Sequence, residues 1–280
     1  MTGSDLSARV AGAYSTLAPR WDTSGAAWNQ PVATRLLGLA GLAPGMCVLD
    51  AGCGAGAVSI PAARAVVPGG RVTGIDLAGP MLTRARQAAL AEGLTNVVFL
   101  NVDASEPSFG PASFDAVLAS FVVYLLADPR ATLARWRNLL RPGGVLAFTW
   151  VVAEDPRLEP VYAAIDEFLP DGQEGWNAFR QRHGWTSVGR AEALLDGCRD
   201  VRTVVEPVTT RYESPEHWWE SSWTQAPALV WRYIPDSRRD QARGVAFKTL
   251  EGLRDGDGSI ARVRTVCYTL ARQAPSGAGG

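Results

Sequence analysis

Several residue types that carry common enzyme chemistries are scarce in this chain of 280 residues. Lys248 is the only lysine, and no GxxxxGK[ST] loop occurs, which excludes a P-loop nucleotide site. The only histidines are His183 and His217, and neither an HExxH motif nor a Cys/His cluster is present. These absences argue against a zinc site. An all-carboxylate magnesium site stays open, but we predict no metal.

The chain also lacks a charge excess, a cysteine pattern and a long apolar run. Its 27 basic and 28 acidic residues leave a net charge of -1, so no global basic field attracts nucleic acid or anionic membranes. Four cysteines (Cys47, Cys53, Cys198 and Cys267) show no CxxC spacing, and nothing resembles a signal peptide or a membrane span. We therefore expect a cytoplasmic protein with reduced thiols and neither a nucleic-acid nor a membrane partner. Homo-oligomer formation stays open.

What the chain does contain, between residues 44 and 152, is a regular alternation of apolar strands and helical segments. In this region the expected strands are 44–52, 71–77, 96–104, 114–121 and 145–151, and the expected helices are 57–67, 80–92 and 129–140. Two more helices are expected before it, at 6–21 and 31–42. Strands and helices alternating at this spacing predict an α/β fold. We expect a Rossmann-like, mostly parallel sheet with helices on both faces.

From residue 153 the alternation gives way to long helical segments rich in tryptophan, at 156–197 and 215–253. Two further strands are expected near 201–214 and 261–273. The resulting organisation has four parts: N-terminal helices over the binding site (1–43), the sheet core (44–152), a mainly helical lid with one core strand (153–260), and a last strand with a flexible tail (261–280). The tryptophans predict an apolar, aromatic-lined substrate site under that lid.

The stretch "VLDAGCGAG" places alternating glycines between a strand and a helix, with Asp50 at the strand end. In an open parallel sheet, ligands bind beyond the carboxyl ends of the strands, and glycines allow the backbone to approach them closely. The loop also satisfies GxGxxA, so an NAD(P)-dependent oxidoreductase is one alternative. A carboxylate at this position opposes a pyrophosphate and attracts a cationic ligand, which favours a ligand that carries ammonium and sulfonium groups.

Two more acids stand at the ends of the next expected strands. Asp76 ends the second strand, where a carboxylate can accept both ribose hydroxyls. Asp103 ends the third strand and is placed for an adenine amino group. Three acids at successive strand ends of one sheet favour a nucleoside ligand with a positive charge.

At this point the sequence resembles the class I S-adenosylmethionine (SAM)-dependent methyltransferases. The resemblance lies in "VLDAGCGAG", "VTGIDLAGPML", "VVFLNVDA", "FDAVLASF" and "LLRPGGVLAF", which occur in this order. It is strongest to the small-molecule type that includes the quinone-biosynthesis C-methyltransferases. The stretch "AYSTLAPRWD" also looks like the N-terminal helix that these enzymes fold over the cofactor.

The resemblance implies SAM as cofactor and assigns roles to particular residues. The implied cofactor-binding residues are Trp21, Asp50, Gly52, Cys53, Gly54, Gly56, Asp76, Leu77, Met81, Asp103, Ala104 and Ser120. The expected substrate-binding residues are Tyr14, Phe121, Tyr124, Trp150 and Trp223, with Tyr14 as the candidate catalytic residue. Tyr14 would act as a polar or cation-facing group beside the transferred methyl. His183 and His217 are the candidate bases, although a surface or structural role is the simpler interpretation of each.

Two positions depart from the pattern of the quinone enzymes. Ala78 stands where a helix-capping serine is common, and Tyr124 stands where a paired histidine is common. The second departure weakens a quinone substrate but leaves cofactor binding intact.

We therefore predict a SAM-dependent methyltransferase that acts on a small, largely apolar or aromatic metabolite in specialised, natural-product biosynthesis. Transfer to oxygen, nitrogen or carbon stays open, and carbon is plausible because an aromatic wall can stabilise developing positive charge. Besides the oxidoreductase, a cyclase that keeps SAM as a scaffold is an alternative.

Overall fold

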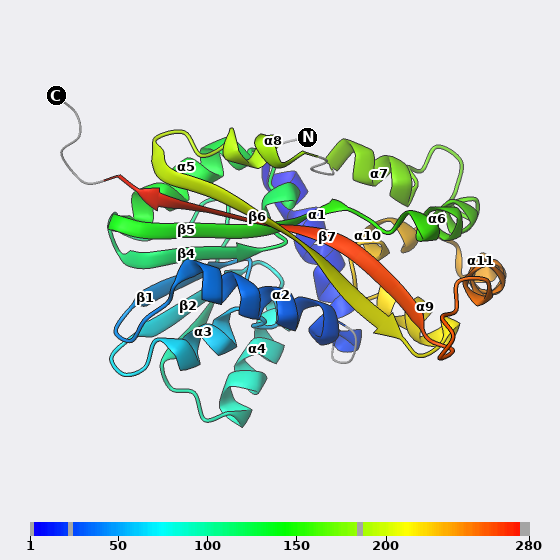
Figure 1. The fold of residues 1–280 in the computed structure, drawn as a ribbon, viewed down its shortest axis with the longest axis horizontal. Helices are drawn as coiled ribbons and strands as arrows, with labels where there is room; N and C mark the ends of the chain where they lie inside the picture. Colours follow the sequence, from blue (N-terminus) through cyan, green and yellow to red (C-terminus); the bar gives the residue numbers. More distant parts are fainter. Residues whose placement is uncertain (1–2, 22–24, 184–186, 275–280) are drawn as a thin grey trace.

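A computed structural model describes residues 3–21, 25–183 and 187–274, which form one seven-stranded sheet in the order β3-β2-β1-β4-β5-β7-β6 (Figure 1). The strands are β1 (Cys47–Ala51), β2 (Arg71–Asp76), β3 (Val97–Asn101), β4 (Phe114–Ser120), β5 (Leu140–Ala153), β6 (Cys198–Tyr212) and β7 (Ile260–Gln273). Strands β1 to β5 pair in parallel, and β7 runs antiparallel to both β5 and β6. The Rossmann-like, mostly parallel sheet is confirmed.

Helices cover both faces of this sheet. They are α1 (Gly3–Leu17), α2 (Gly25–Ala40), α3 (Ser59–Ala65), α4 (Gly79–Ala91), α5 (Pro129–Leu139), α6 (Glu159–Asp166), α7 (Trp176–His183), α8 (Val188–Glu192), α9 (Pro215–Ser222), α10 (Ala228–Trp231) and α11 (Asp236–Glu251), with 3-10 turns at Ala18–Arg20, Val123–Leu125 and Pro156–Leu158. Every residue of β1 is buried. Leu49 and Ala51 pack on the side of α5 and α8, whereas Val48 packs on the side of α2 and α3. A strand buried on both faces explains the continuous apolar run in the sequence.

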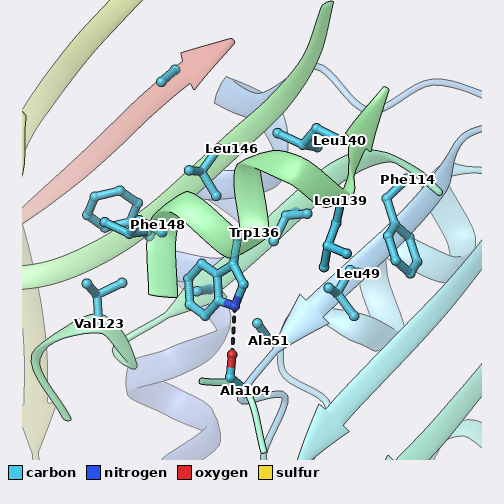
Figure 2. Close-up of a cluster of buried hydrophobic side chains, with 14 of the residues drawn as sticks. Leu49, Ala51, Ala104, Phe114, Val123, Trp136, Leu139, Leu140, Leu146 and Phe148 are labelled. Carbon is cyan, nitrogen blue, oxygen red and sulfur yellow. Dashed lines mark hydrogen bonds between the residues drawn. The ribbon is translucent and has the colours of Figure 1, made fainter. Parts of the chain in front are cut away.

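The core between the sheet and α5 centres on Trp136, which is fully buried (Figure 2). Its indole Nε1–H donates a hydrogen bond of 2.7 Å to the carbonyl oxygen of Ala104, in the loop after β3. This bond satisfies a buried polar group, and it also ties α5 to that loop. Helix α5 therefore helps to position the loop that follows β3.

The starts of α2 and β5 differ most from the expected boundaries. Helix α2 begins at Gly25 and continues through Pro31, although a proline favours a helix start and lacks the N–H that an interior position donates. The extra turns bring Trp28 into the core, where it is 5% exposed and stacks on Phe121. Strand β5 begins at Leu140, so the "RPGG" stretch belongs to an irregular start of the strand, with a register shift against β4.

The later helices surround an aromatic core of their own, built on Tyr162, Trp218 and Trp231. Strands β6 and β7 are long and run from the sheet into this cluster, which includes Tyr212 and Ile260 (Figure 1). Helix α8 is an exception within the expected lid segment, because it packs on the sheet beside α5. The helical part thus shares two strands with the sheet. Within the described residues, no helix has the length and apolar character to cross a membrane.

Candidate active site

A cavity of about 580 Å³ lies at the carboxyl ends of the parallel strands. Helix α1 covers it with Ser7, Val10, Ala11 and Tyr14, and the helical part contributes Trp176, Phe179 and Arg180. Fifteen of the residues expected from the sequence line this one cavity: Tyr14, Trp21, Asp50, Gly52, Cys53, Gly54, Asp76, Leu77, Met81, Asp103, Ala104, Ser120, Phe121, Tyr124 and Trp150. The structure therefore brings the expected cofactor and substrate residues together.

Two expected site residues are not among the described residues that line the cavity. Gly56 has a φ of 92° and directs the chain into α3, where an added Cβ would lie 3.0 Å from Ile60. Trp223 packs on Trp219 and Trp231 in the aromatic core of the helical part. Gly56 therefore shapes the turn, and Trp223 supports the helices rather than facing the cavity.

The glycine loop is held close to the sheet by backbone bonds. The N–H groups of Gly52 and Cys53 donate to the carbonyl of Ile75, at 2.8 and 2.9 Å. Gly52 has a φ of 74°, and an added Cβ would lie 2.5 Å from a methyl group of Val122. Only glycine fits such a position without strain or collision. The loop thus offers bare backbone to the cavity.

Asp76 connects the end of β2 to two neighbouring segments. One carboxylate oxygen accepts a hydrogen bond of 2.9 Å from the N–H of Gly54, and the other accepts one of 2.8 Å from the N–H of Ala78. Ala78 is the N-cap residue of α4 and has no side chain that can cap the helix. The bond that its N–H donates to Asp76 therefore anchors the start of α4. Burial raises the pKa of Asp76, although the two N–H donors counteract it. Each carboxylate oxygen keeps a lone pair for a ribose hydroxyl.

Asp50 is almost fully buried at the end of β1, with 1% of its surface exposed. One of its oxygens accepts a hydrogen bond of 2.5 Å from the hydroxyl of Ser59. Burial raises the pKa of Asp50 to about 7, so the carboxyl group is only partly ionised at neutral pH. The charge at this strand end is weaker than the sequence alone suggests, and a bound cation would favour its ionised form.

The ends of β3 and β4 complete the strand-end lining of the cavity. We call this lining the cofactor side, after the role that the sequence analysis expects for it. The side chain of Asp103 accepts a bond of 2.7 Å from the N–H of Ser105, which leaves its second oxygen available. The hydroxyl of Ser120 lies 3.1 Å from that of Thr149. Phe121 has a φ of 59°, which is strained for a side chain of this size. Strain of this kind is concentrated where a site requires a particular backbone course.

Tyr14 and Tyr124 are neighbouring phenols in the lining of the cavity. Burial raises the pKa of Tyr14 well above its ordinary value, and the nearby Tyr124 and Asp76 raise it further. Burial also raises the pKa of Tyr124, to about 12. Both phenols therefore stay protonated at neutral pH. Tyr14 can donate a hydrogen bond or pack on a ligand, but it is a poor general base.

The other side of the cavity contains a polar group that the sequence analysis did not predict. Glu154 and Arg262 form a buried ion pair, with contacts of 2.5 and 2.9 Å between the carboxylate and the guanidinium. The side-chain oxygen of Gln225 accepts bonds from Arg262 at 3.2 Å and from Arg264 at 2.9 Å. Burial alone would raise the pKa of Glu154, but Arg262, with smaller contributions from Arg264 and Arg180, outweighs burial and lowers the pKa.

The signal for these arginines is the stretch "ARVRTV" in the last strand. Residues two apart on a strand share a face, so Arg262 and Arg264 point the same way. Hydrophobic patterning favours Val263 as the buried residue of this segment, yet Val263 is 38% exposed and the arginines are buried. Only the arrangement of β7 in the sheet reveals this inversion.

Comparisons with known proteins agree with this geometry. Residues 48–144 match a family described as "Methyltransferase domain". The chain is 33% identical to the nocamycin O-methyltransferase of Saccharothrix syringae, over 94% of this chain and 98% of that protein. It is 35% identical to an aklanonic acid methyltransferase of a Streptomyces species (strain C5), over 72% of this chain and 96% of that protein. The chain belongs to the class I SAM-dependent methyltransferases.

A solved structure shows the same fold. The phosphoethanolamine N-methyltransferase 2 of Haemonchus contortus, in complex with phosphomonomethylethanolamine and S-adenosylhomocysteine (SAH), superposes with a TM-score of 0.54 at 20% identity. The match covers 87% of this chain and 52% of that one. The family decides between the two cofactors that the glycine loop left open, and the cofactor of this methyltransferase is SAM. The oxidoreductase alternative is thereby wrong.

The residues of the methyltransferase fit this cofactor. The glycine loop is a cradle that a Cβ at Gly52 would fill, and the buried carboxylate of Asp50 and the partly buried carboxylate of Asp76 stand at the strand ends beside it. These groups would hold an ammonium group and a ribose, whereas a diphosphate would meet carboxylates instead of cations. When bound, SAM supplies an electrophilic methyl group on a sulfonium. What the protein contributes is orientation of the acceptor and exclusion of water.

The histidines do not supply a base within the described part of the cavity. The imidazole of His217 accepts a bond of 3.3 Å from the N–H of Glu213 and packs edge-on against Tyr212, outside the cavity lining. The side chain of His183, like Trp185, lies outside the residues whose side chains are described.

Proposed function

We propose that this methyltransferase transfers a methyl group to an oxygen of a small, largely apolar or aromatic metabolite in natural-product biosynthesis. The observation that carries the proposal is the extent of the match to the nocamycin O-methyltransferase. That match covers 94% of the chain, so it includes segments outside residues 48–144, which hold much of the acceptor side of the cavity. The second relative is likewise named for a single small molecule, aklanonic acid.

The lining of the cavity supports an aromatic acceptor. Beyond the strand ends, it presents the rings of Trp28, Phe121, Trp150, Trp176 and Phe179. Trp28 stacks on Phe121 with centroids 5.3 Å apart, and Trp176 stacks on Phe179 at 5.6 Å. Flat, rigid rings of this kind bind planar apolar molecules at low cost in conformational entropy.

We assign the cofactor to Asp50, the glycine loop, Asp76 and Asp103, and the acceptor to the aromatic rings and Tyr124. Tyr14 lies where it can separate the two ligands and exclude water. The protonated state of Tyr14 and Tyr124 favours an acceptor that reacts without the removal of a proton by these phenols. An acidic oxygen that enters the cavity ionised meets this requirement, whereas an unactivated carbon does not, which is why we favour oxygen over carbon.

The test uses SAM labelled with carbon-13 in the methyl group and a panel of aromatic acids, phenols, 1,3-dicarbonyl compounds and aromatic amines. A labelled O-methyl product would support this function. Carbon–proton correlation in NMR identifies the atom that carries the transferred methyl group. A labelled N-methyl or C-methyl product from the same panel would contradict transfer to oxygen. Conversion of an acceptor with no label incorporated would instead indicate the cyclase.

A further inference from the structure

The acceptor side of the cavity contains a buried arginine without a counter-ion. Arg264 is 3% exposed and lines the cavity. Its guanidinium donates to the neutral oxygens of Gln225 at 2.9 Å and Thr210 at 3.2 Å, and its Nε has no hydrogen-bond partner. Among the residues whose side chains are described, no carboxylate forms an ion pair with it. The buried carboxylate of Glu154, which lines the same cavity, is already bound to Arg262 through two contacts.

The charges that line the cavity are divided between its two sides. The cofactor side has Asp50, Asp76 and Asp103, whereas the described acceptor side has Glu154, Glu159, Arg180, Arg262 and Arg264. Three arginines against two glutamates leave the acceptor side one positive charge in excess, and Glu159 lies at the exposed margin. A buried, unbalanced cation is costly to keep, so it is expected where a ligand supplies the missing negative charge.

Arg264 is also held in a fixed orientation. Its guanidinium lies over the ring of Trp28, 3.1 Å from the centroid, and Trp28 in turn stacks on Phe121 at the end of β4. Its charge acts on Tyr124, whose pKa it lowers against the larger effect of burial. The cation is therefore placed beside the aromatic walls proposed for the acceptor. A planar guanidinium fixed by stacking is suited to binding a carboxylate or enolate through two parallel hydrogen bonds.

We propose that Arg264 binds an anionic oxygen group of the acceptor, so that the acceptor is an apolar acid: a carboxylic acid or an acidic enol that enters the cavity ionised. This inference rests on the proposed function, because it narrows the acceptor of the same site. An acceptor that arrives ionised needs no protein base, in agreement with the two protonated tyrosines. The positive charge on this side also complements the acidic side that holds the cationic cofactor.

The experiment measures the binding of two matched probes to the SAH-saturated protein, by calorimetry at neutral pH. The probes are 2-naphthoate and the neutral 2-naphthamide, which have the same ring system. The wild type should bind the acid at least about tenfold more tightly than the amide, as expected for hydrogen bonds to a charged group. Arg264→Gln should abolish this preference and retain the affinity for the amide. Arg272→Gln, an exposed arginine of the same strand, is the matched control and should keep the preference.

Folding and cofactor binding are checked in the same samples. Because Arg264→Gln removes an unbalanced buried charge, its melting temperature should equal or exceed that of the wild type, and its affinity for SAH should be unchanged. A lower melting temperature with the acid preference intact would show that Arg264 only supports the fold, and would overturn the proposal. Arg264→Lys, which keeps the charge but loses the planar donor pair, should bind the acid with intermediate affinity.

The remaining outcomes separate this inference from the proposed function. Equal affinity of the wild type for both probes would refute the role of Arg264 and leave an aromatic acceptor site standing. If neither probe binds to protein that is saturated with SAH, the aromatic acceptor site itself fails, and the inference about Arg264 fails with it.

Discussion

The cofactor side and the acceptor side of the cavity are built in different ways. The cofactor side consists of short loops at the ends of β1, β2 and β3, and it presents backbone and three aspartates. The acceptor side consists of side chains from α1, α2, α7 and the long strands β5 and β7, and it presents aromatic rings and arginines. Cofactor binding therefore depends on local backbone geometry, whereas acceptor recognition depends on contacts between residues far apart in the sequence.

The buried carboxylates on the two sides of the cavity also differ in the kind of partner that stabilises their charge. The carboxylate of Asp50 accepts a hydrogen bond from Ser59, and that of Asp76 accepts hydrogen bonds from backbone N–H groups. These donors lie in the loops and helices next to the strand ends. Glu154 and Arg262 are 108 residues apart and depend on one another. Loss of the Asp76 carboxylate should therefore mainly weaken ligand binding, whereas loss of the Glu154 carboxylate should mainly destabilise the fold.

The largest effect is expected for Glu154→Gln. This change leaves the guanidinium of Arg262 buried without a counter-ion, which costs about 3–5 kcal/mol of unfolding free energy. Urea denaturation of the ligand-free protein measures it. The matched control is Glu206→Gln, since the ion pair of Glu206 with Arg35 is exposed and should contribute no more than about 1 kcal/mol. Similar losses for the two variants would contradict the proposed contrast.

The second effect concerns the pH dependence of stability. The raised pKa of Asp50, about 7, means that the folded protein keeps a proton that the unfolded chain releases near pH 4. Between these values stability should fall as pH rises, by up to about 1.4 kcal/mol per pH unit from this group. In Asp50→Asn that contribution should disappear. Denaturation of ligand-free wild type and variant across this pH range measures the difference, and parallel pH profiles would exclude the effect.

The third prediction is that Asp76→Asn weakens SAH binding by at least about tenfold, because the amide cannot replace a carboxylate toward two hydroxyls and two backbone N–H groups. Calorimetry with SAH measures it. Arg264→Gln serves as the control from the acceptor side and should leave SAH affinity unchanged. Unaltered affinity in Asp76→Asn would refute the ribose role.

The smallest effect is expected for Tyr14→Phe. Since the pKa of Tyr14 lies well above its ordinary value, the phenol is not a base at neutral pH. The variant should lose no more than a few-fold in kcat with an acceptor identified by the labelled-SAM assay, and its pH profile should match that of the wild type. A large loss that recovers at high pH would contradict this and identify Tyr14 as a catalytic base.

The strand-end residues were predictable because their positions follow from local order. Asp50 and Asp76 lie in the last two residues of β1 and β2, Asp103 follows β3 by two residues, and parallel strands place their carboxyl ends along one edge. Sequence reasoning was wrong for Trp223, which was expected to bind the substrate but packs on Trp219 and Trp231. A tryptophan in a helical segment can face a cavity or a neighbouring helix, and sequence spacing does not distinguish these environments.

By itself, the sequence determined the α/β fold, the glycine loop and the acids at the strand ends beside it, because short contiguous motifs specify each of them. Only the tertiary structure decided that Arg262 and Arg264 face inward while Val263 faces outward, since strand pairing sets which face of β7 is covered. It also decided that Glu154 neutralises one arginine and leaves the other without a counter-ion. That balance depends on contacts across more than a hundred residues, which no local pattern encodes.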